Sequence, residues 1–573
     1  MQNKKIPEDS LTGLVLKRAL DAAILQAGVK LQALVTDNQE ADVEPVTIAR
    51  LVVDRENNCL KVQLRGTSKD VNAWARWTLF RLLIKHRNLL HESDSLAVLH
   101  TEISEDKLTL TLEMPNQLNK VFNREFFRIE LRQYLSLPIT LHLDELTLQG
   151  RLEDFSAGGC RIALSPQLAL HLIRPLNSSL RCTITFPNGN TLSSPFEMTY
   201  LKPQEGFLYA LVGCHFQHET TKEEKQFVHH AFEIEREVAR LSNVQRTSKH
   251  KSALFESLHK KSQKTFEPED ALSPLAKLLM PQGFAAKILA LANQLALQAI
   301  FLAMDKKLSP KHLKPLAIDF IEALGSNGNA VRLALQQPNS AINPVILHTM
   351  RVISHCFPLA FKIGINRNME LPVMMSLLLH DLGKLFVSEQ PCFNPLKLSP
   401  DMLRLMKQNQ IQLLRAAGAL HWIPSSIGES LLVNANERLD GTGYPRGLKQ
   451  DRLDALSRLV SVCKVLDCLV QGYNDPAMRW RDAYKWVHQH KNWFDLSMLR
   501  CFIKQYGLRP LNSRVVYSGG YVASVTEVSK QGEILEVILL KAIKPTANLL
   551  GKRVNTPEDF VKLGKIKGTL VAS

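Results

Sequence analysis

The sequence predicts a multidomain α+β protein. Its 573 residues are too many for one hydrophobic core. Apolar and polar residues alternate in several runs up to about residue 216, helical spacing follows from about residue 268, and alternation returns near the C-terminus. We therefore expect an N-terminal α+β domain (1–118), a β-barrel domain (119–242), a basic linker (243–267), an all-α domain (268–505) and a small C-terminal β extension (506–573).

The N-terminal domain is predicted to combine helices and strands. An apolar helical stripe covers residues 12–36, and a second helical pattern covers residues 71–86, which contain Trp74 and Trp77. Alternating runs predict strands over residues 46–54, 60–64, 96–103 and 108–114. No pattern in this domain indicates a particular chemistry.

The barrel region contains residues suited to a guanine nucleotide. Arg124 and Arg128 lie four residues apart, and a guanidinium group is a planar fork that binds phosphate oxygens or the O6/N7 edge of guanine. Asp154 could accept from guanine N–H groups, and Ser156 could add a hydroxyl contact. Gly159 and the glycine before it allow a sharp turn close to a flat ligand. The set predicts a site for an anionic guanine dinucleotide.

These motifs resemble those of the PilZ family, Arg-x-x-x-Arg followed by Asp/Asn-x-Ser-x-x-Gly. The resemblance implies a six-stranded β-barrel that binds cyclic di-GMP, often as an intercalated dimer, through Arg124, Arg128, Asp154, Ser156 and Gly159. Many members carry another arginine just before the first, where this chain has asparagine, so the ligand stoichiometry stays open. The alternative is a set of surface arginines beside an ordinary Asp-Ser turn.

The all-α domain contains a second informative set of residues. It comprises His348, the pair His380 and Asp381, and a loop over residues 440–445 that reads Asp-Gly-Thr-Gly-Tyr-Pro. The set resembles the HD-GYP domain, whose active members hydrolyse cyclic di-GMP at two or three metal ions. The resemblance covers roughly residues 310–545 and implies a helical bundle in which imidazoles and carboxylates bind adjacent metals.

Four of the seven metal-ligand positions implied by this resemblance are replaced. The replaced positions hold Asn409, Ala435, Asn436 and Lys464. An ammonium group repels a nearby divalent ion, but it could take the place of a metal and pair with Asp381. We therefore expect no metal and no two-metal hydrolysis, with His380 and Asp381 as buried hydrogen-bonding partners. The alternative is one weak ion at His348, His380 and Asp381.

The loop from Asp440 to Pro445 keeps the family pattern, as does Glu437 before it. Two readings stay open. The loop could turn the chain between helices, or it could dock a partner, because the resemblance implies that such loops contact GGDEF cyclase domains.

The linker and the bulk composition add weaker indications. Residues 246–264 hold six Lys/Arg against one acid, which is typical of a solvated linker, while a nucleic-acid arm is the sharper alternative. The net charge of +16 suits anionic partners of several kinds. Nine scattered cysteines without C-x-x-C pairs indicate reduced residues and a cytoplasmic location. We expect no membrane span and no signal peptide.

Three classes of function follow from these residues. The first is a cyclic di-GMP receptor whose PilZ domain binds the nucleotide and whose HD-GYP-like domain is an inactive output or scaffold without a cofactor. The second is an active metal-dependent cyclic di-GMP phosphodiesterase regulated by PilZ. The third is a nucleic-acid-binding regulator, which the absence of a helix-turn-helix or an aromatic binding platform in the sequence argues against. The sequence favours the first, a pseudoenzyme of bacterial second-messenger signalling.

Overall fold

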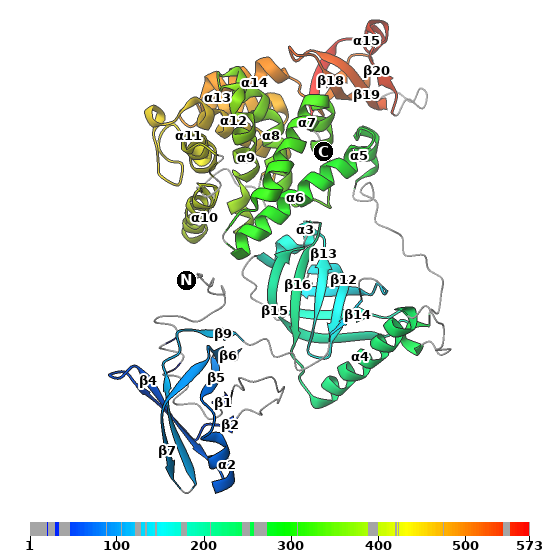
Figure 1. Ribbon diagram of the computed structural model, residues 1–573. Helices are drawn as coiled ribbons and strands as arrows, with labels where there is room; N and C mark the ends of the chain where they lie inside the picture. The colour runs from blue at the N-terminus through cyan, green and yellow to red at the C-terminus, as the bar shows by residue number, and fades with distance from the viewer. Residues whose placement is uncertain are drawn as a thin grey trace. The chain divides into compact units, whose positions relative to one another are not determined.

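The structure is a computed structural model (Figure 1). It describes residues 16, 20, 29–33, 46–86, 89–104, 106–120, 128–131, 134–143, 146–173, 180–204, 206, 208–242, 252–256, 272–305, 307–387, 399–418, 421, 423–473, 475–542 and 551–571. The chain divides into two compact units, Met1–Phe127 and Arg128–Ser573, which are described separately.

The first unit is built on a nine-stranded antiparallel sheet with the order β2-β1-β5-β7-β8-β4-β3, to which β6 and β9 add beside β5. The strands are β1 (Lys30–Ala33), β2 (Val46–Thr47), β3 (Arg50–Asp54), β4 (Cys59–Arg65), β5 (Leu79–His86), β6 (Leu89–Ser93), β7 (Leu96–Ser104), β8 (Lys107–Glu113) and β9 (Leu118–Lys120). Alternation places Leu60, Val62 and Leu64 of β4 in the core, which confirms the period-two pattern.

Two helix predictions in this unit are wrong in part. Helix α2 (Ser68–Trp74) begins at the N-cap Thr67 with a capping box and ends at Trp74, whereas residues 79–86 form strand β5. Phe80, Leu82 and Ile84 alternate inward on β5, which pairs with β1 and β6. Residues 30–33 of the predicted stripe 12–36 form β1. Long-range strand pairing outweighed the local helical pattern.

A β-barrel opens the second unit. Six strands close a ring, because β13 pairs with β16 on one side and with β12 on the other, and the two-residue strand β10 adds to β12. The strands are β10 (Ile129–Glu130), β11 (Pro138–Leu143), β12 (Leu146–Ser156), β13 (Gly159–Leu164), β14 (Leu180–Thr185), β15 (Thr191–Pro203) and β16 (Ala210–Phe216). This ring confirms the six-stranded barrel.

Three short segments and one long helix accompany the barrel. Helix α3 (Pro166–Ala169) and the 3-10 turn η1 (Leu170–Ile173) follow β13 directly, and α4 (Thr221–Ser242) buries Phe227 and Ile234. The described part of the predicted linker, residues 252–256, is partly buried, although Ala253 and Glu256 are exposed. Its turn η2 (Ala253–Phe255) buries Leu254 and Phe255, and Phe255 packs edge-on against Phe186 of the barrel. The apolar side chains within this basic stretch therefore attach it to the barrel.

The helical domain consists of α5 (Pro274–Leu279), α6 (Phe284–Asp305), α7 (Pro310–Leu335), α8 (Pro344–Lys362), α9 (Glu370–Leu379), α10 (Pro400–Gly418), α11 (Ser425–Gly428), α12 (Ala455–Gln471), α13 (Trp480–Gln489) and α14 (Leu496–Tyr506). Local signals set several of their ends. Helix α8 begins with Pro344 after the N-cap Asn343, and α12 runs from the N-cap Asp454 to Gly472, whose φ of 70° is left-handed.

Short turns between these helices matter for the site. They are η5 (Leu382–Phe386), η7 (Glu429–Val433) and η8 (Asn434–Asn436). The C-terminal extension is a five-stranded sheet, β20-β19-β18-β17-β21, with strands β17 (Arg514–Tyr517), β18 (Tyr521–Val528), β19 (Ile534–Ala542), β20 (Arg553–Val554) and β21 (Ile566–Leu570) and one helix, α15 (Pro557–Leu563). Its core includes Leu333 of α7, so the extension packs on the helical domain.

Helix α6 is long and apolar enough to cross a membrane by length and composition, yet 56% of its apolar window is buried in the structure. It packs against α7, α3 and β15, and Leu295 and Ile300 have no exposed surface. These contacts are those of a core helix. All eight cysteines in the described part of the chain are free thiols, and seven of them are buried.

Candidate functional site

The barrel brings two predicted nucleotide-binding residues into contact. Asp154 lies near the end of β12, and Arg128 immediately precedes β10, which pairs with β12. The Nη1 atom of Arg128 donates to both carboxylate oxygens of Asp154, at 3.1 and 3.3 Å. Arg124 lies outside the described residues. The pairing of Arg128 with Asp154 joins the two halves of the motif.

A second arginine, which sequence reasoning missed, completes this cluster. The Nε atom of Arg161 lies 3.3 Å from Oδ2 of Asp154, and its Nη2 atom donates to Glu130 at 2.8 Å. Arg161 is the cross-strand partner of Asp154 in the register of β12 and β13. The register of the strand pair would have pointed to it, because directly opposed residues interact.

The buried carboxylate of Asp154 is paired with both arginines. Its side chain is 2% exposed, whereas those of Arg128 and Arg161 are 27% and 28% exposed. Burial raises the pKa of Asp154, and the two guanidinium charges oppose that shift. Burial and the Asp154 carboxylate likewise raise the pKa of Tyr200. A buried carboxylate therefore anchors two guanidinium groups that keep part of their surface accessible to a ligand.

Ser156 and Gly159 have structural partners in the same turn. The hydroxyl of Ser156 donates to the carbonyl of Gly159 at 2.9 Å, and Ser156 is 4% exposed. A Cβ atom on Gly159 would lie 2.3 Å from the carbonyl oxygen of Cys214. Glycine is therefore required here by close strand packing. A direct contact of Ser156 or Gly159 with a ligand stays a prediction.

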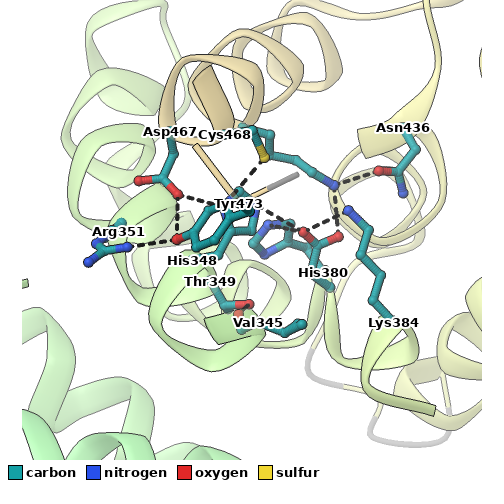
Figure 2. Close-up of polar contacts among 12 residues, drawn as sticks. Val345, His348, Thr349, Arg351, His380, Lys384, Asn436, Asp467, Cys468 and Tyr473 are labelled. Carbon is teal, nitrogen blue, oxygen red and sulfur yellow. Dashed lines mark hydrogen bonds and ion pairs between the residues drawn. The ribbon is translucent and has the colours of Figure 1, made fainter. Parts of the chain in front are cut away.

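The helical domain contains a buried ionic core, which we define as His348, His380, Asp381, Lys384, Lys464 and Asp467 (Figure 2). Helix α8 provides His348, and helix α12 provides Lys464 and Asp467. His380 and Asp381 lie between α9 and η5, and Lys384 lies in η5. All six side chains are at most 4% exposed. The helical domain thus brings together residues more than eighty positions apart.

Asp381 is the centre of this core. Lys464 Nζ donates to Oδ1 at 2.8 Å, and Lys384 Nζ donates to Oδ2 at 3.1 Å. This pairing of Lys464 with Asp381 confirms the sequence-based expectation. Burial alone would raise the pKa of Asp381, but the charges of Lys384 and Lys464 outweigh it and hold that pKa well below its ordinary value. The carboxylate is therefore ionised.

The pKa values of Lys384 and Lys464 are shifted in opposite directions. Burial opposes the charge on Lys384, yet the Asp381 carboxylate holds the pKa of Lys384 above its ordinary value. Burial lowers the pKa of Lys464 to about 7, and repulsion from Lys384 adds to this effect against the attraction of Asp381. Two ammonium groups that share one carboxylate are not equivalent.

The two histidines also differ. His380 Nδ1 lies 2.6 Å from the carbonyl oxygen of Leu377, and burial lowers the pKa of His380 to about 3, so its ring is neutral and donates through Nδ1. His348 lies between two carboxylates, with Nδ1 at 2.6 Å from Asp467 and Nε2 at 3.2 Å from Asp381. Although burial opposes it, Cys468 and both carboxylates hold the pKa of His348 well above its ordinary value. We assign His348 as an imidazolium.

A hydrogen-bond chain that sequence reasoning missed supports His348 from behind. Tyr473 donates its hydroxyl proton to Asp467 at 3.2 Å, and Arg351 Nη1 donates to the Tyr473 oxygen at 2.6 Å. Arg351 also donates to the carbonyl of Leu335. Asp467 lies three residues after Lys464, so one face of α12 presents both to the core. That helical spacing was the signal available in the sequence.

Three residues of the ionic core, His348, His380 and Asp381, have side-chain atoms that could bind a metal ion. The ligand atoms of His348, His380 and Asp381 lie within 4.8 Å of one another, and neither Nε2 atom of the two histidines has a hydrogen-bond partner. However, both oxygens of Asp381 bind ammonium groups. These residues do not fit a two-metal centre, because the described part of the chain offers no second group of ligand residues beside them.

The replaced positions lie where such ligands would be needed. Asn436 accepts a hydrogen bond from Lys464 Nζ through Oδ1 at 2.6 Å, which places it at the ionic core. Asn409 donates to the carbonyl of Gly383, and Gly383 lies three residues after His380. Ala435 is buried and offers no ligand atom. Amide and methyl groups here cannot replace imidazole donors.

Contacts with Glu437 hold the conformation of the loop over residues 440–445 and of the residues that follow it. The buried carboxylate of Glu437 accepts backbone N–H groups from Arg446, Gly447 and Leu448 at 2.7 to 3.1 Å. A Cβ on Gly443 would lie 2.4 Å from the Glu437 backbone, and Tyr444 is 2% exposed. These contacts support the reading in which the loop turns the chain. Docking of a GGDEF domain stays a prediction.

Comparisons with known families agree with the architecture. A model described as PilZ domain matches residues 122–233, and one described as HD domain matches residues 340–498. The chain is 26% identical over 323 residues to Cyclic di-GMP phosphodiesterase PA4108 of Pseudomonas aeruginosa, which covers 52% of this chain and 74% of that protein. It is 30% identical over 129 residues to 3'3'-cGAMP-specific phosphodiesterase 1 of Vibrio cholerae, covering 22% of this chain and 28% of that protein.

Among solved structures, Bd1817 of Bdellovibrio bacteriovorus, an HDG"Y"P protein, has a TM-score of 0.34 at 14% identity, covering 66% of this chain and 98% of its own. YcgR of Escherichia coli in complex with c-di-GMP has a TM-score of 0.18 at 15% identity, covering 41% of this chain and 95% of its own. The first match lies on the closed barrel, and the second lies on the helices that hold the ionic core. Residues 122–233 are a PilZ domain, and residues 340–498 are an HD-family domain.

Proposed function

We propose that this protein is a receptor for cyclic di-GMP that binds the nucleotide at its barrel and does not hydrolyse it in its helical domain. The observation that carries the proposal is the anchoring of Arg128 and Arg161 by the buried Asp154 within the PilZ match. Two relatives of this chain are named as phosphodiesterases for cyclic dinucleotides, which supports a cyclic dinucleotide as the ligand.

The chemistry of the arginine pair suits this ligand. Each guanidinium group has five N–H donors, and Asp154 occupies only part of them. The remaining donors can bind a phosphate or the O6/N7 edge of guanine through paired hydrogen bonds. Arg124 would add a third guanidinium from the segment before β10. Asp154 then acts chiefly by holding Arg128 and Arg161 in position.

Loss of hydrolysis follows from the residues of the ionic core. In-line displacement of a phosphodiester by this chemistry needs metals that activate water and clamp both the attacking and the leaving oxygens. Asn409, Ala435 and Asn436 supply no imidazole, and Lys464 donates to the carboxylate that a metal would need. The helical domain is proposed to serve as output or scaffold instead.

A contact between the barrel and the helical domain supports an output role. The side-chain oxygen of Gln167, in α3, accepts the backbone N–H of Asn343 at 2.9 Å, and Asn343 is the N-cap of α8. Helix α3 follows β13, which carries Arg161, and α8 carries His348. The η1 turn contacts η5 of the ionic core. A ligand at β12 and β13 is thus connected to the core by one short helix.

Titration calorimetry of the full chain with cyclic di-GMP tests the receptor assignment. Arg128→Ala removes a charge-assisted contact and is expected to weaken binding roughly 10- to 100-fold. Arg181→Ala is the matched control, since Arg181 is 49% exposed on β14 and pairs only loosely with Glu219, at 3.8 Å. Its affinity should equal that of the wild type. Unchanged binding in Arg128→Ala would refute the assignment.

A turnover assay on the same preparation tests the second half of the proposal. Incubation with cyclic di-GMP and manganese is expected to release neither linear pGpG nor GMP. Product formation that disappears in Asp381→Asn would establish the alternative, a phosphodiesterase regulated by PilZ, which the names of the relatives favour.

For the GGDEF partner, pull-down with Thr442→Ala and Arg446→Ala, two exposed loop residues, would show whether the loop binds such a domain.

A further inference from the structure

Asp381 is surrounded by cations that belong to the chain itself. Lys464 Nζ lies 2.8 Å from Oδ1, while Lys384 Nζ and His348 Nε2 lie 3.1 and 3.2 Å from Oδ2. Asp381 has no exposed surface, and none of its three neighbours is more than 3% exposed. An ionised carboxylate at this depth needs such compensation to be stable.

Lys464 is held in this position from two sides. Besides Asp381, its Nζ atom donates to Oδ1 of Asn436 at 2.6 Å. Asn436 comes from η8, which packs on α12, and Lys464 lies in the middle of α12. The ammonium group therefore joins three separate segments of the domain: α12, η8 and the turn after α9. A metal ion could hold such segments together in the same way.

The surrounding charges leave no place for a divalent ion beside this lysine. Lys464 Nζ and Lys384 Nζ already contact the two oxygens of Asp381, at 2.8 and 3.1 Å. A divalent ion bound to this carboxylate would therefore lie directly beside two lysine side chains. Repulsion between buried like charges at this distance is strong.

We propose that Lys464 is a built-in cation that replaces a metal ion as the partner of Asp381, so that the helical domain folds and remains folded without a divalent metal. Lys464 also excludes the ion that His348, His380 and Asp381 would otherwise bind. This proposal concerns the ionic core alone and is independent of nucleotide binding by the barrel.

The first test uses the wild-type full chain. Elemental analysis of the purified protein is expected to find far less than one equivalent of manganese, iron, zinc or nickel per chain. Its melting temperature should be the same in EDTA and in excess manganese. One equivalent of tightly bound metal, or a lower melting temperature in EDTA, would overturn the proposal whatever the barrel binds.

The second test exchanges the lysine. Lys464→Asp places a carboxylate beside His348, His380 and Asp381, and it should melt roughly 10 °C lower than the wild type in EDTA. Manganese should raise that melting temperature again. Lys464→Met is the matched control, because it keeps the approximate length of the side chain but supplies no charge and only a soft thioether, which is a poor ligand for manganese. It should also melt lower, but manganese should leave it unchanged.

Two outcomes of the exchange would contradict the proposal. One is a folded Lys464→Asp protein that does not respond to manganese, since exclusion of the ion would then not depend on the lysine. The other is an equal response of both variants. If Lys464→Asp does not fold, the wild-type measurements and Lys464→Met still test the claim.

Discussion

Asp381→Ala is expected to lower the free energy of unfolding of the helical domain by about 3–5 kcal/mol, the range for breaking a buried ion pair from one side. The substitution leaves the ammonium groups of Lys384 and Lys464 in the interior without their shared carboxylate. His348 loses one of its two acidic partners as well. The loss of stability comes from burying charges without a counter-charge, and its free energy exceeds that of losing any one hydrogen bond. Calorimetric unfolding of the full chain measures it.

Two further variants separate this mechanism from a general loss of packing. Asp381→Ala combined with Lys464→Met should recover part of the stability, because one of the uncompensated charges is removed. Asp401→Ala should change stability by less than about 0.5 kcal/mol, since the Asp401 side chain is 80% exposed. A loss below about 1 kcal/mol in Asp381→Ala would show that the ionic core does not stabilise the fold.

Gly159→Ala is expected to destabilise the barrel by about 1–3 kcal/mol, the usual cost of forcing an extra methyl group into a packed interior. The added Cβ would lie 2.3 Å from the carbonyl oxygen of Cys214, a backbone atom of the neighbouring strand β16. Backbone cannot rotate away as a side chain can, so β13 and β16 must separate. Since β13 also carries Arg161, binding of cyclic di-GMP should weaken too.

Gly213→Ala provides the contrast for this prediction. Its added Cβ would lie 2.2 Å from the ring of Tyr200, so the obstructing atoms belong to a side chain that can turn. Gly213 lies on β16, and Gly159 on the adjacent strand β13. We expect a smaller loss of stability for Gly213→Ala than for Gly159→Ala, measured by thermal unfolding. The reverse order would show that strand packing at Gly159 is not tight.

Short-range patterns carried most of what the sequence predicted correctly. The period of two in β4 and the sharp turn before Gly159, between β12 and β13, each depend on a few neighbouring residues. The same local reading failed over residues 79–86, where apolar residues suggested a helix. There the pairing of β5 with β1, which lies far earlier in the sequence, and with the next strand β6 decided the outcome.

Residue identity and local spacing were enough to identify the PilZ motif, the barrel and the helical domain, and the HD-GYP resemblance implied the replacement of four ligand positions. Long-range packing was needed to show that Arg161 shares Asp154 with Arg128, that Asp467 supports His348, and that the predicted linker packs through Phe255. Lys464 and Asp381 lie 83 residues apart, so their contact depends on how α12 packs beside the turn after α9. Spacing in one dimension does not specify such a contact, since it arises from long-range packing of helices whose relative placement no local pattern sets.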